Sequence, residues 1–356
     1  MGRKVAELQK RLEWIELQPS SPEINNELMR TRVDLNCWLD KEDDMWRQRS
    51  RLNWFQSGDR NTSFFHAKAS TWQKKNFIEG ILDENEVWQE DDRYKDLFST
   101  SQPTEFSKLL QAIQPKVTTS MNQTLTREYN VAEIKLALKQ MYPLKAAGPD
   151  GMPPLFFQQF WTICGEVVIA TVLDFLNHGI SPPEFNKTHI VLIPKVNTPK
   201  KVTDYRPISL CNVVYKIASK AIANRLKKIL PSIISDTQSA FVHGRLITDN
   251  VLVAFETMHH ISQKKRGKIG EMALKLDMSK AYDRVEWDCL EKIMEKLGFD
   301  VKWRSLIMKC VTTVSYSIKI NGVPRGNIFL SRGNPSRRPF ITLSIYLMCR
   351  GTLISY

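Results

Sequence analysis

The sequence lacks any long hydrophobic stretch, and its longest apolar runs, such as Phe340 to Met348, extend for about nine residues. A membrane-spanning helix needs about 20 apolar residues, so no membrane association is expected. The N-terminal residues Met1 to Lys4 do not begin the apolar core of a signal peptide. The six cysteines form no C-x-x-C pair, which argues against a disulfide scaffold and against a zinc site. We therefore expect an intracellular protein with reduced cysteines.

Acidic residues are scarce in the second half of the chain. The whole sequence has 51 Lys and Arg against 38 Asp and Glu, a formal net charge of +13. Residues 1–180 carry 22 basic and 25 acidic side chains, whereas residues 181–356 carry 29 basic and 13 acidic side chains. A basic half joined to a nearly neutral half suggests contact with a polyanion such as nucleic acid, although a merely soluble basic surface has the same composition.

The first 130 residues combine helical patterns with polar connections. Residues 1–50 are predicted to be helical, and the spacing from Ser20 to Glu23 is that of a capping box. Residues 1–92 form one predicted region, in which the segment 77–88 reads as two short strands. Residues 93–130 are polar, contain two prolines, and are predicted to be a linker.

Aromatic and cationic side chains are interleaved between residues 46 and 88. The set comprises Trp46, Arg47, Arg49, Arg51, Trp54, Phe55, Arg60, Phe64, Phe65, Lys68, Trp72, Lys74, Lys75 and Trp88. Such residues could stack on bases and hold phosphates. They could equally be core anchors with solvated charges between them, and the composition favours this second interpretation.

The central region alternates helical and extended patterns. Val131 to Met141 is predicted to be a helix, followed by strong turn chemistry at Gly148-Pro149-Asp150-Gly151 and an apolar helix over Phe156 to Asn177. This turn is not a phosphate loop, because the Walker Gly-Lys-Ser/Thr ending is absent. His189 to Pro194 and Asp204 to Leu210 are predicted to be extended.

A basic helical pattern follows from Val214 to Ile229 and is predicted to end at Pro231. Its cations are Lys216, Lys220, Arg225, Lys227 and Lys228. These side chains could follow a nucleic-acid backbone, or they could be solvated charges on a surface helix. The summed charge of residues 181–270, with 15 basic and 5 acidic residues, favours a polyanion.

Asp277 occupies a position where the hydrophobic period changes. Apolar residues alternate from Met272 to Leu276, as in a half-buried strand, and a helical period runs from Ser279 to a stop at Gly298. A carboxylate between a strand and a helix can hold a divalent cation, although such a residue is more often a helix cap. Further on, Val314 to Val323 is predicted to be a β-hairpin that turns at Asn321-Gly322.

Several short motifs together resemble those of reverse transcriptases from non-LTR (LINE-type) retrotransposons, especially the plant type. The markers are Trp46 to Arg51, Gly58 to His66, Gly148 to Gly151, Leu192 to Lys195, Tyr205 to Leu210, Gln238 to Arg245 with Asp249-Asn250, and Asp277 to Val285. The resemblance covers about residues 40–333. Each motif is weak alone, but the full set in family order is specific.

The resemblance implies an α+β fold with the fingers–palm polymerase architecture of a reverse transcriptase, incomplete here and preceded by a helical N-terminal region. The partial polymerase domain would comprise residues 131–333. Asp277 would be the first catalytic carboxylate and a ligand of Mg²⁺, since nucleotidyl transfer uses two metal ions. Tyr282 would stack under the incoming sugar, while Lys195 and Arg206 would bind the triphosphate.

The resemblance also implies nucleic-acid contacts. Gln238, Gly244 and Arg245 would lie along the template, and the aromatic and basic segment 46–88 would contribute to RNA binding. The implied partners are an RNA template, a DNA primer and dNTPs, without a membrane, and the implied location is the cytoplasm and nucleus. The oligomeric state is not predicted.

The sequence departs from the family after Gly333. The family continues with an Arg-Gln-Gly-Asp-Pro-Leu-Ser-Pro stretch and a Tyr-Ala-Asp-Asp turn, but here no Asp or Glu follows Asp300. Residues Met348 to Leu353 can be encoded so that a one-base shift reads Cys-Ala-Glu-Gly-Leu, which is family-like. We therefore expect residues 334–356 to be a frameshifted tail, for which a sequencing or gene-model error is an equally good cause.

Two-metal chemistry needs carboxylates on both sides of the metals, so this chain alone is expected to be inactive as a polymerase. One alternative is a residual nucleic-acid-binding module, and another is a pseudogene product without catalysis. A group II intron maturase is disfavoured by the segment from Gly58 to His66.

Overall fold

The structure is a computed structural model of the chain. It describes residues 2–19, 21–50, 70–71, 77–78, 81–82, 88–89, 100, 110–111, 113–201, 204–235, 238, 242, 244–264, 272–273 and 285–333. These residues belong to two compact units, Met1–Glu79 and Gly80–Tyr356. The boundary therefore falls before the predicted one at residue 92. The tail 334–356 lies outside the described residues, as does most of the aromatic and basic segment.

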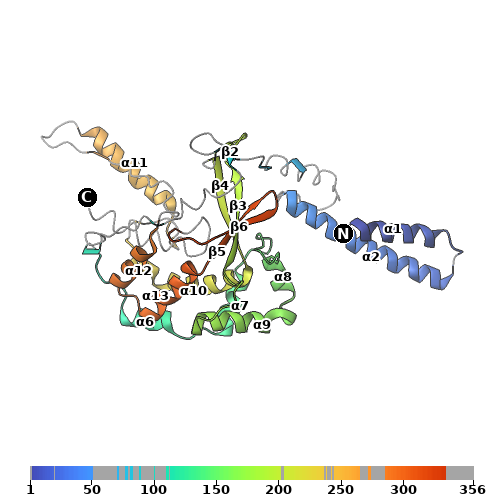
Figure 1. Ribbon diagram of the computed structural model, residues 1–356, viewed down its shortest axis with the longest axis horizontal. Coiled ribbons are helices and arrows are strands. Elements are labelled where there is room, and N and C mark those ends of the chain that lie inside the picture. Colours follow the sequence, from blue (N-terminus) through green and yellow to red (C-terminus); the bar gives the residue numbers. More distant parts are fainter. Residues whose placement is uncertain are drawn as a thin grey trace. The chain divides into compact units, whose positions relative to one another are not determined.

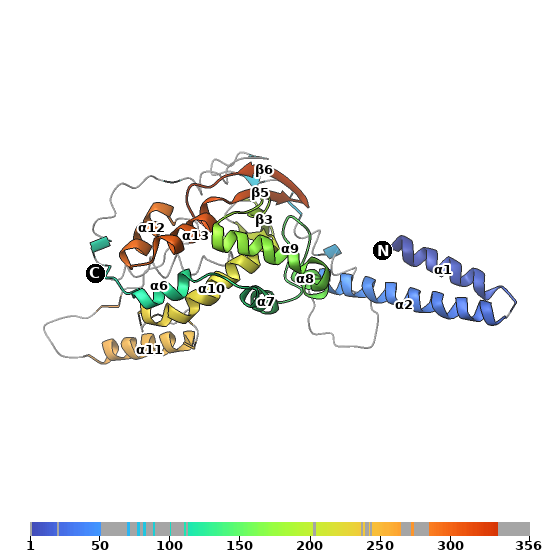
Figure 2. The same cartoon turned by 90° about the horizontal axis from the view of Figure 1, so that it is seen from below.

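The first unit contains a helical hairpin, as predicted for residues 1–50. Helix α1 (Gly2–Glu16) is followed by the longer α2 (Pro22–Ser50), which runs back along it (Figures 1 and 2). Val5, Leu8 and Ile15 are buried along α1. The backbone N–H of Ile24 donates to the Ser21 hydroxyl at 3.2 Å, so Ser21 caps α2. The predicted cap residue Ser20 lies outside the described residues.

A four-stranded mixed sheet forms the frame of the second unit. Its strands are β3 (Lys187–Pro194), β4 (Tyr205–Cys211), β5 (Ser315–Ile320) and β6 (Val323–Ile328), in the order β4-β3-β5-β6. The pairs β3–β4 and β5–β6 are antiparallel, whereas β3 and β5 are parallel. The predicted hairpin is confirmed: Asn321 and Gly322 have φ values of 49° and 91°, as a type I′ turn requires.

Helices pack beside this sheet around one hydrophobic core. They are α6 (Thr119–Thr126), α7 (Val131–Lys139), α8 (Pro154–Gln159), α9 (Trp161–Leu173), α10 (Val213–Ile233), α12 (Trp287–Lys296) and α13 (Val301–Thr312). The core is built largely from aliphatic side chains of these helices, such as Ile134, Ile217 and Ile293, each with 0% exposure. The β3–β4 hairpin extends away from the helices (Figure 1), so its connecting loop lies far from the core.

Three predicted elements differ from the observed ones. The segment 93–130, expected to be a linker, contains helix α6, and Leu125 within it has 0% exposure because it packs in the core. The apolar helix predicted for residues 156–177 is divided into α8, α9 and a π-helical turn (Asp174–His178) that ends at Gly179, where φ is 73°. Helix α10 continues past Pro231 to Ile233, because a proline near a helix end disturbs few hydrogen bonds.

The strand and helix predicted around Asp277 fall mostly outside the described residues. Met272 and Ala273 are described and are not in a strand, and Val285 precedes the helix instead of lying in it. Helix α12 begins at Trp287, and Glu286 just before it forms an isolated antiparallel bridge with Arg332. At Glu286, the described backbone thus forms a bridge where the pattern predicted a helix.

Two short strands, β1 (Ile81–Leu82) and β2 (Trp88–Gln89), pair as predicted, whereas Phe77 and Ile78 are not in a strand. A further helix, α11 (Ile247–Gln263), carries largely exposed side chains. No helix in the described part of the chain is long and apolar enough to cross a membrane.

Candidate nucleotide and nucleic-acid interface

Two predicted triphosphate-binding cations lie at the same end of the β3–β4 pair. In the antiparallel register Ile193 pairs with Arg206, and the Lys195 backbone N–H donates to the Asp204 carbonyl oxygen at 2.7 Å. Lys195 and Arg206 are therefore diagonal neighbours on one face, at a typical separation of about 7–8 Å. Both residues are exposed. The structure thus places these two cations at the same end of the strand pair, and their binding of a triphosphate stays a prediction.

The loop between β3 and β4 is fastened by Asp204, a residue that the sequence reasoning did not single out. One carboxylate oxygen accepts the backbone N–H groups of Lys200 at 3.0 Å and Lys201 at 2.9 Å. These two backbone hydrogen bonds, together with the nearby lysine charges, hold the pKa of the Asp204 carboxyl below its usual value of 3.8. The carboxylate therefore stays ionised and keeps the lysine-rich loop folded back on itself. The sequence signal for this kind of turn is an Asp that comes three residues after the end of a Pro-Lys-Lys run.

Side chains along β3 alternate between a buried face and the partly exposed face that carries His189 and Ile193. Thr188, Ile190 and Leu192 are buried, whereas His189 between them is half-buried. Its Nδ1 lies 2.7 Å from the Ser317 hydroxyl of β5. Burial, followed by the charges of Lys319 and Lys187, lowers the pKa of His189 below 6.5. The imidazole is therefore neutral at pH 7 and adds no cation to this face.

The Gly148 to Gly151 turn is anchored on the N-terminus of α10. The Asp150 backbone N–H donates to the Asn212 side-chain oxygen at 3.2 Å, and the Gly151 N–H donates to the Gly148 carbonyl at 3.1 Å. A Cβ on Gly148 would lie 2.5 Å from the Asn212 backbone nitrogen. The sequence predicted the turn, but only the fold shows why glycine is needed: the backbone of the next helix approaches too closely for a side chain.

The segment predicted to follow the template is described only in part. Gln238, Gly244 and Arg245 are described, and Gly244 has a φ of 81°. The Arg245 Nη1 donates to the carbonyl oxygens of Ser235 at 2.6 Å and Gln238 at 2.8 Å. The arginine therefore closes its own segment into a loop, and this structural role was not anticipated.

Two of the cations expected on the surface of α10 are buried. Lys216 is 7% exposed, and its Nζ donates to the Ala146 carbonyl at 2.8 Å behind the Gly148 turn. Burial lowers the pKa of Lys216 below its usual 10.5. Arg225 is only 1% exposed. The hypothesis that these two residues follow a nucleic-acid backbone is therefore wrong, whereas Lys227 and Lys228 on the same helix are exposed.

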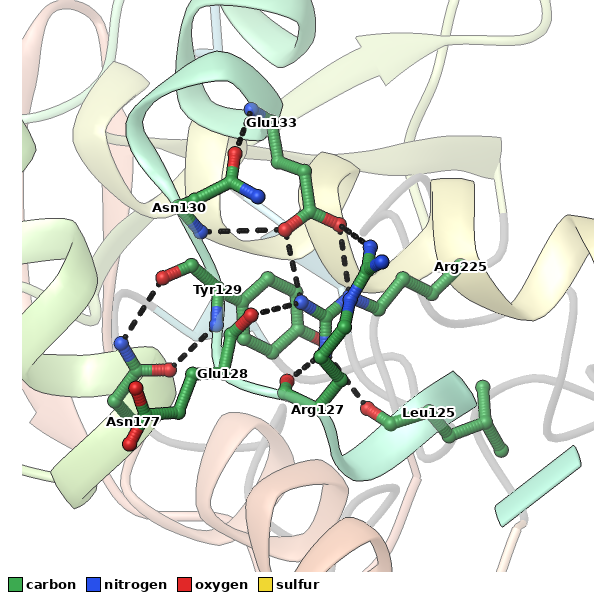
Figure 3. A network of polar contacts seen from close by, with 8 residues as sticks. All are labelled: Leu125, Arg127, Glu128, Tyr129, Asn130, Glu133, Asn177 and Arg225. Carbon is green, nitrogen blue, oxygen red and sulfur yellow. Dashed lines mark hydrogen bonds and ion pairs between the residues drawn. The ribbon is translucent and has the colours of Figure 1, made fainter. Parts of the chain in front are cut away.

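Arg225 instead joins α10 to the segment between α6 and α7 (Figure 3). Its Nε and Nη2 each donate to Glu133 at 2.8 Å, and Nη2 also donates to the Glu128 carbonyl at 2.8 Å. Nη1 donates to the carbonyl oxygens of Leu125, at 2.9 Å, and Arg127. A guanidinium has five N–H donors, so these five hydrogen bonds use them all. No donor remains for a phosphate.

The surroundings of Arg225 favour this ion pair. Glu133 also completes a capping box at the start of α7, where its carboxylate accepts the Asn130 N–H at 3.2 Å. Burial alone would raise the pKa of Glu133, but the hydrogen bonds and charge of Arg225 outweigh it and hold the pKa below 4.5. The guanidinium carbon lies 3.4 Å from the centre of the Tyr129 ring, and burial raises the pKa of that phenol.

The remaining predicted site residues, Asp277 and Tyr282, lie outside the described residues. Within the residues that the structure does describe, no group of three or more His, Cys, Asp or Glu side chains could hold a metal ion. The described part of the chain therefore contains cationic groups suited to phosphates but no donor set for a divalent metal.

Comparison with known proteins agrees with the sequence motifs. Residues 193–335 match the family described as reverse transcriptase (RNA-dependent DNA polymerase). Over 296 residues, 80% of this chain, 28% are identical to a Xenopus laevis protein described as "Transposon TX1 uncharacterized 149 kDa protein", of which 22% is covered.

Two shorter similarities involve other mobile elements. The chain is 26% identical over 163 residues to the retrovirus-related Pol polyprotein from type-1 retrotransposable element R2 of Nasonia vitripennis, covering 46% of this chain and 15% of the relative. It is 27% identical over 161 residues to the probable RNA-directed DNA polymerase from transposon BS of Drosophila melanogaster, covering 41% of this chain and 17% of the relative.

These matches confirm the resemblance to reverse transcriptases of non-LTR retrotransposons and the α+β fold class. Residues 193–335 thus resemble part of a reverse transcriptase domain, and the described helices α1 and α2 precede them. It spans between 15% and 22% of the length of the curated relatives that it matches.

Proposed function

We propose that this chain supplies the nucleotide-binding fingers and the first part of the palm of an RNA-directed DNA polymerase from a non-LTR retrotransposon. The observation that carries the proposal is that Lys195 and Arg206 are diagonal neighbours at one end of β3–β4. Both residues fall within the segment that matches the reverse transcriptase family. A triphosphate is the substrate group that two such cations would bind.

The chemistry of the two cations suits complementary roles. The Arg206 guanidinium can donate two parallel hydrogen bonds to one phosphate, whereas the Lys195 ammonium acts as a compact point charge. Asp204 supports the site because its carboxylate is held by two loop N–H groups and fixes the loop that follows Lys195. We propose that Tyr282 contacts the sugar of the same nucleotide.

Template contact is proposed for the loop from residue 235 to 245. Because Arg245 donates to two carbonyl oxygens of this loop, we propose it as a positioning residue that presents Gln238 and Gly244 to the template. The RNA contacts of the aromatic and basic segment 46–88 remain a prediction. Since the proposed template is RNA and the primer is DNA, the chain is expected in the cytoplasm and nucleus.

Metal binding is proposed for Asp277, since carboxylate oxygens are the ligands that Mg²⁺ prefers. When bound, Mg²⁺ would stabilise the charge that develops on the transferred phosphate. No Asp or Glu follows Asp300, so these 356 residues lack the two carboxylates that the family carries in its Tyr-Ala-Asp-Asp turn. We therefore propose that the chain by itself binds nucleic acid without extending a primer.

A primer-extension assay tests this proposal. The purified chain, an RNA template with a DNA primer, dNTPs and Mg²⁺ should give salt-sensitive binding of the template–primer and no primer extension. Extension that is lost in Asp277→Ala would contradict the proposed inactivity. Absence of both binding and extension would favour a pseudogene product with no nucleic-acid role.

A further inference from the structure

Helices α7, α8 and α9 pack against one another, away from the end of β3–β4 that carries Lys195 and Arg206 (Figures 1 and 2). Residues of these helices and of the segment between α7 and α8 line an open cavity. The cavity has a volume of about 560 Å³, within the range of small-ligand sites. It is lined by Lys135, Leu138, Lys139, Met141, Pro143, Gln158 and Trp161. No acidic residue is among these described lining residues.

The cavity combines a cationic edge with an aromatic and apolar lining. Lys135 and Lys139 are four residues apart on α7, so they lie on one face of the helix with about 5–6 Å between Cβ atoms. Both side chains are exposed. Leu138, Met141 and Pro143 supply apolar surface. A ligand that fits this lining has a planar or apolar part and neighbouring negative charges.

The indole of Trp161 is held in a defined position. Gly165, one turn further along α9, is buried, and a Cβ there would lie 2.8 Å from the Trp161 ring atom Cε2. Glycine therefore lets the ring lie against the helix, and Trp161 is half-buried between the core and the cavity. A held aromatic ring is the feature on which proteins stack unpaired bases.

The C-terminus of α7 would repel an anion if its carbonyl oxygens were free. Here the Gln158 side-chain nitrogen donates to the carbonyl oxygens of Leu138 at 3.1 Å and Met141 at 3.0 Å. These two acceptors are satisfied inside the protein, which reduces the local negative potential. The net potential at the cavity edge is then set by the two lysines.

We infer that this cavity binds single-stranded nucleic acid, with a base beside Trp161 and neighbouring phosphates on Lys135 and Lys139. This inference rests on the proposed function, which gives the chain an RNA template, and it adds a subsite separate from the β3–β4 end. An acidic peptide could satisfy the lysines, but a nucleic acid satisfies the lysines and the aromatic ring together.

Fluorescence anisotropy with a labelled single-stranded oligouridylate tests the inference. The double variant Lys135→Gln/Lys139→Gln should weaken binding about tenfold at low salt, and the slope of log K against log salt should fall by about 1.4, or 0.7 per lost phosphate contact. The control Lys296→Gln/Lys302→Gln removes two exposed lysines elsewhere, and it should leave the slope unchanged. Trp161→Leu should weaken binding about tenfold, whereas Trp161→Phe should retain most of it.

Several outcomes would overturn the inference. Equal affinities and slopes for the cavity and control double variants, with binding by the unmodified chain intact, would overturn the cavity subsite alone. Absence of RNA binding by the unmodified chain would overturn the proposed function as well. If the cavity variants lost a glutamate- and leucine-containing peptide but kept the RNA, the cavity would belong to a protein partner. Equal thermal midpoints for all variants confirm that they fold.

Discussion

Arg225 separates two interpretations of helix α10, one in which its cations follow a nucleic-acid backbone and one in which they hold the fold together. Replacement by methionine keeps most of the volume but removes all five donors that reach Glu133 and the three carbonyl oxygens. Arg225 is 1% exposed, and Glu133 is 20% exposed. Removing one partner of a buried pair costs about 3–5 kcal/mol, and here the Glu133 carboxylate would be left with the Asn130 N–H at 3.2 Å and the Arg127 guanidinium at 3.6 Å.

That cost is a large part of the free energy of unfolding of a typical domain, which is about 5–15 kcal/mol. Arg225→Met should therefore lower the midpoint of thermal unfolding by about 6–20 °C. Lys227→Gln, which removes an exposed cation two residues away, should change the stability by less than about 0.5 kcal/mol. Thermal unfolding and urea denaturation, both followed by circular dichroism, measure the midpoint and the free energy of unfolding of both variants.

The double variant Arg225→Met/Glu133→Leu also removes the carboxylate that has lost its main partner and should recover part of the loss. RNA affinity of folded Arg225→Met, measured well below its unfolding temperature, should equal that of the unmodified chain. A stability loss below about 1 kcal/mol, or a loss of RNA affinity without a loss of stability, would refute the structural role of Arg225.

Three further predictions concern the turn, the sheet and the loop. Gly148→Ala should destabilise the chain by about 1–3 kcal/mol in urea denaturation, because its Cβ would lie 2.5 Å from the Asn212 nitrogen; an unchanged midpoint would contradict this. The lowered pKa of His189 means that the unfolded chain binds its proton more readily, so stability should fall as the pH drops below 6.5. His189→Gln should reduce this pH dependence, and an identical slope would exclude His189 as its source. Asp204→Ala should accelerate amide hydrogen exchange at Lys200 and Lys201, whereas Asp204→Asn, which keeps one acceptor oxygen, should do so less; equal exchange in all three proteins would show that the carboxylate does not fasten the loop.

Sequence patterns correctly predicted elements whose conformation depends mainly on residues that are neighbours along the chain. Alternation and turn chemistry predicted β3 and the hairpin at Asn321-Gly322, and helical period predicted α7. The family resemblance implied that Lys195 and Arg206 bind one triphosphate, and the register of β3 and β4 places the two residues at the same end of the strand pair.

The misjudged features depend on contacts between distant segments. Arg225 looks like a surface cation in the helical pattern, because its partners lie 92 to 100 residues away. Leu125 lies in a polar stretch, yet it is buried because α6 packs on α10 and α13. Asp204 accepts two backbone hydrogen bonds from its own loop, and motifs for catalytic residues do not indicate this structural role.

If Lys195 and Arg206 bind a nucleoside triphosphate at the end of β3–β4, the chain should crosslink to a photoreactive dNTP there. The control is Lys302→Gln, an exposed lysine on α13. Charge-assisted hydrogen bonds contribute about 1.5–3 kcal/mol each, so Lys195→Gln and Arg206→Gln should each weaken crosslinking about tenfold or more. We expect this loss in both variants, together with competition between tripolyphosphate and the dNTP in the unmodified chain. The thermal midpoints of the variants should be unchanged. Equal crosslinking by Lys195→Gln, Arg206→Gln and Lys302→Gln would contradict triphosphate binding at this end.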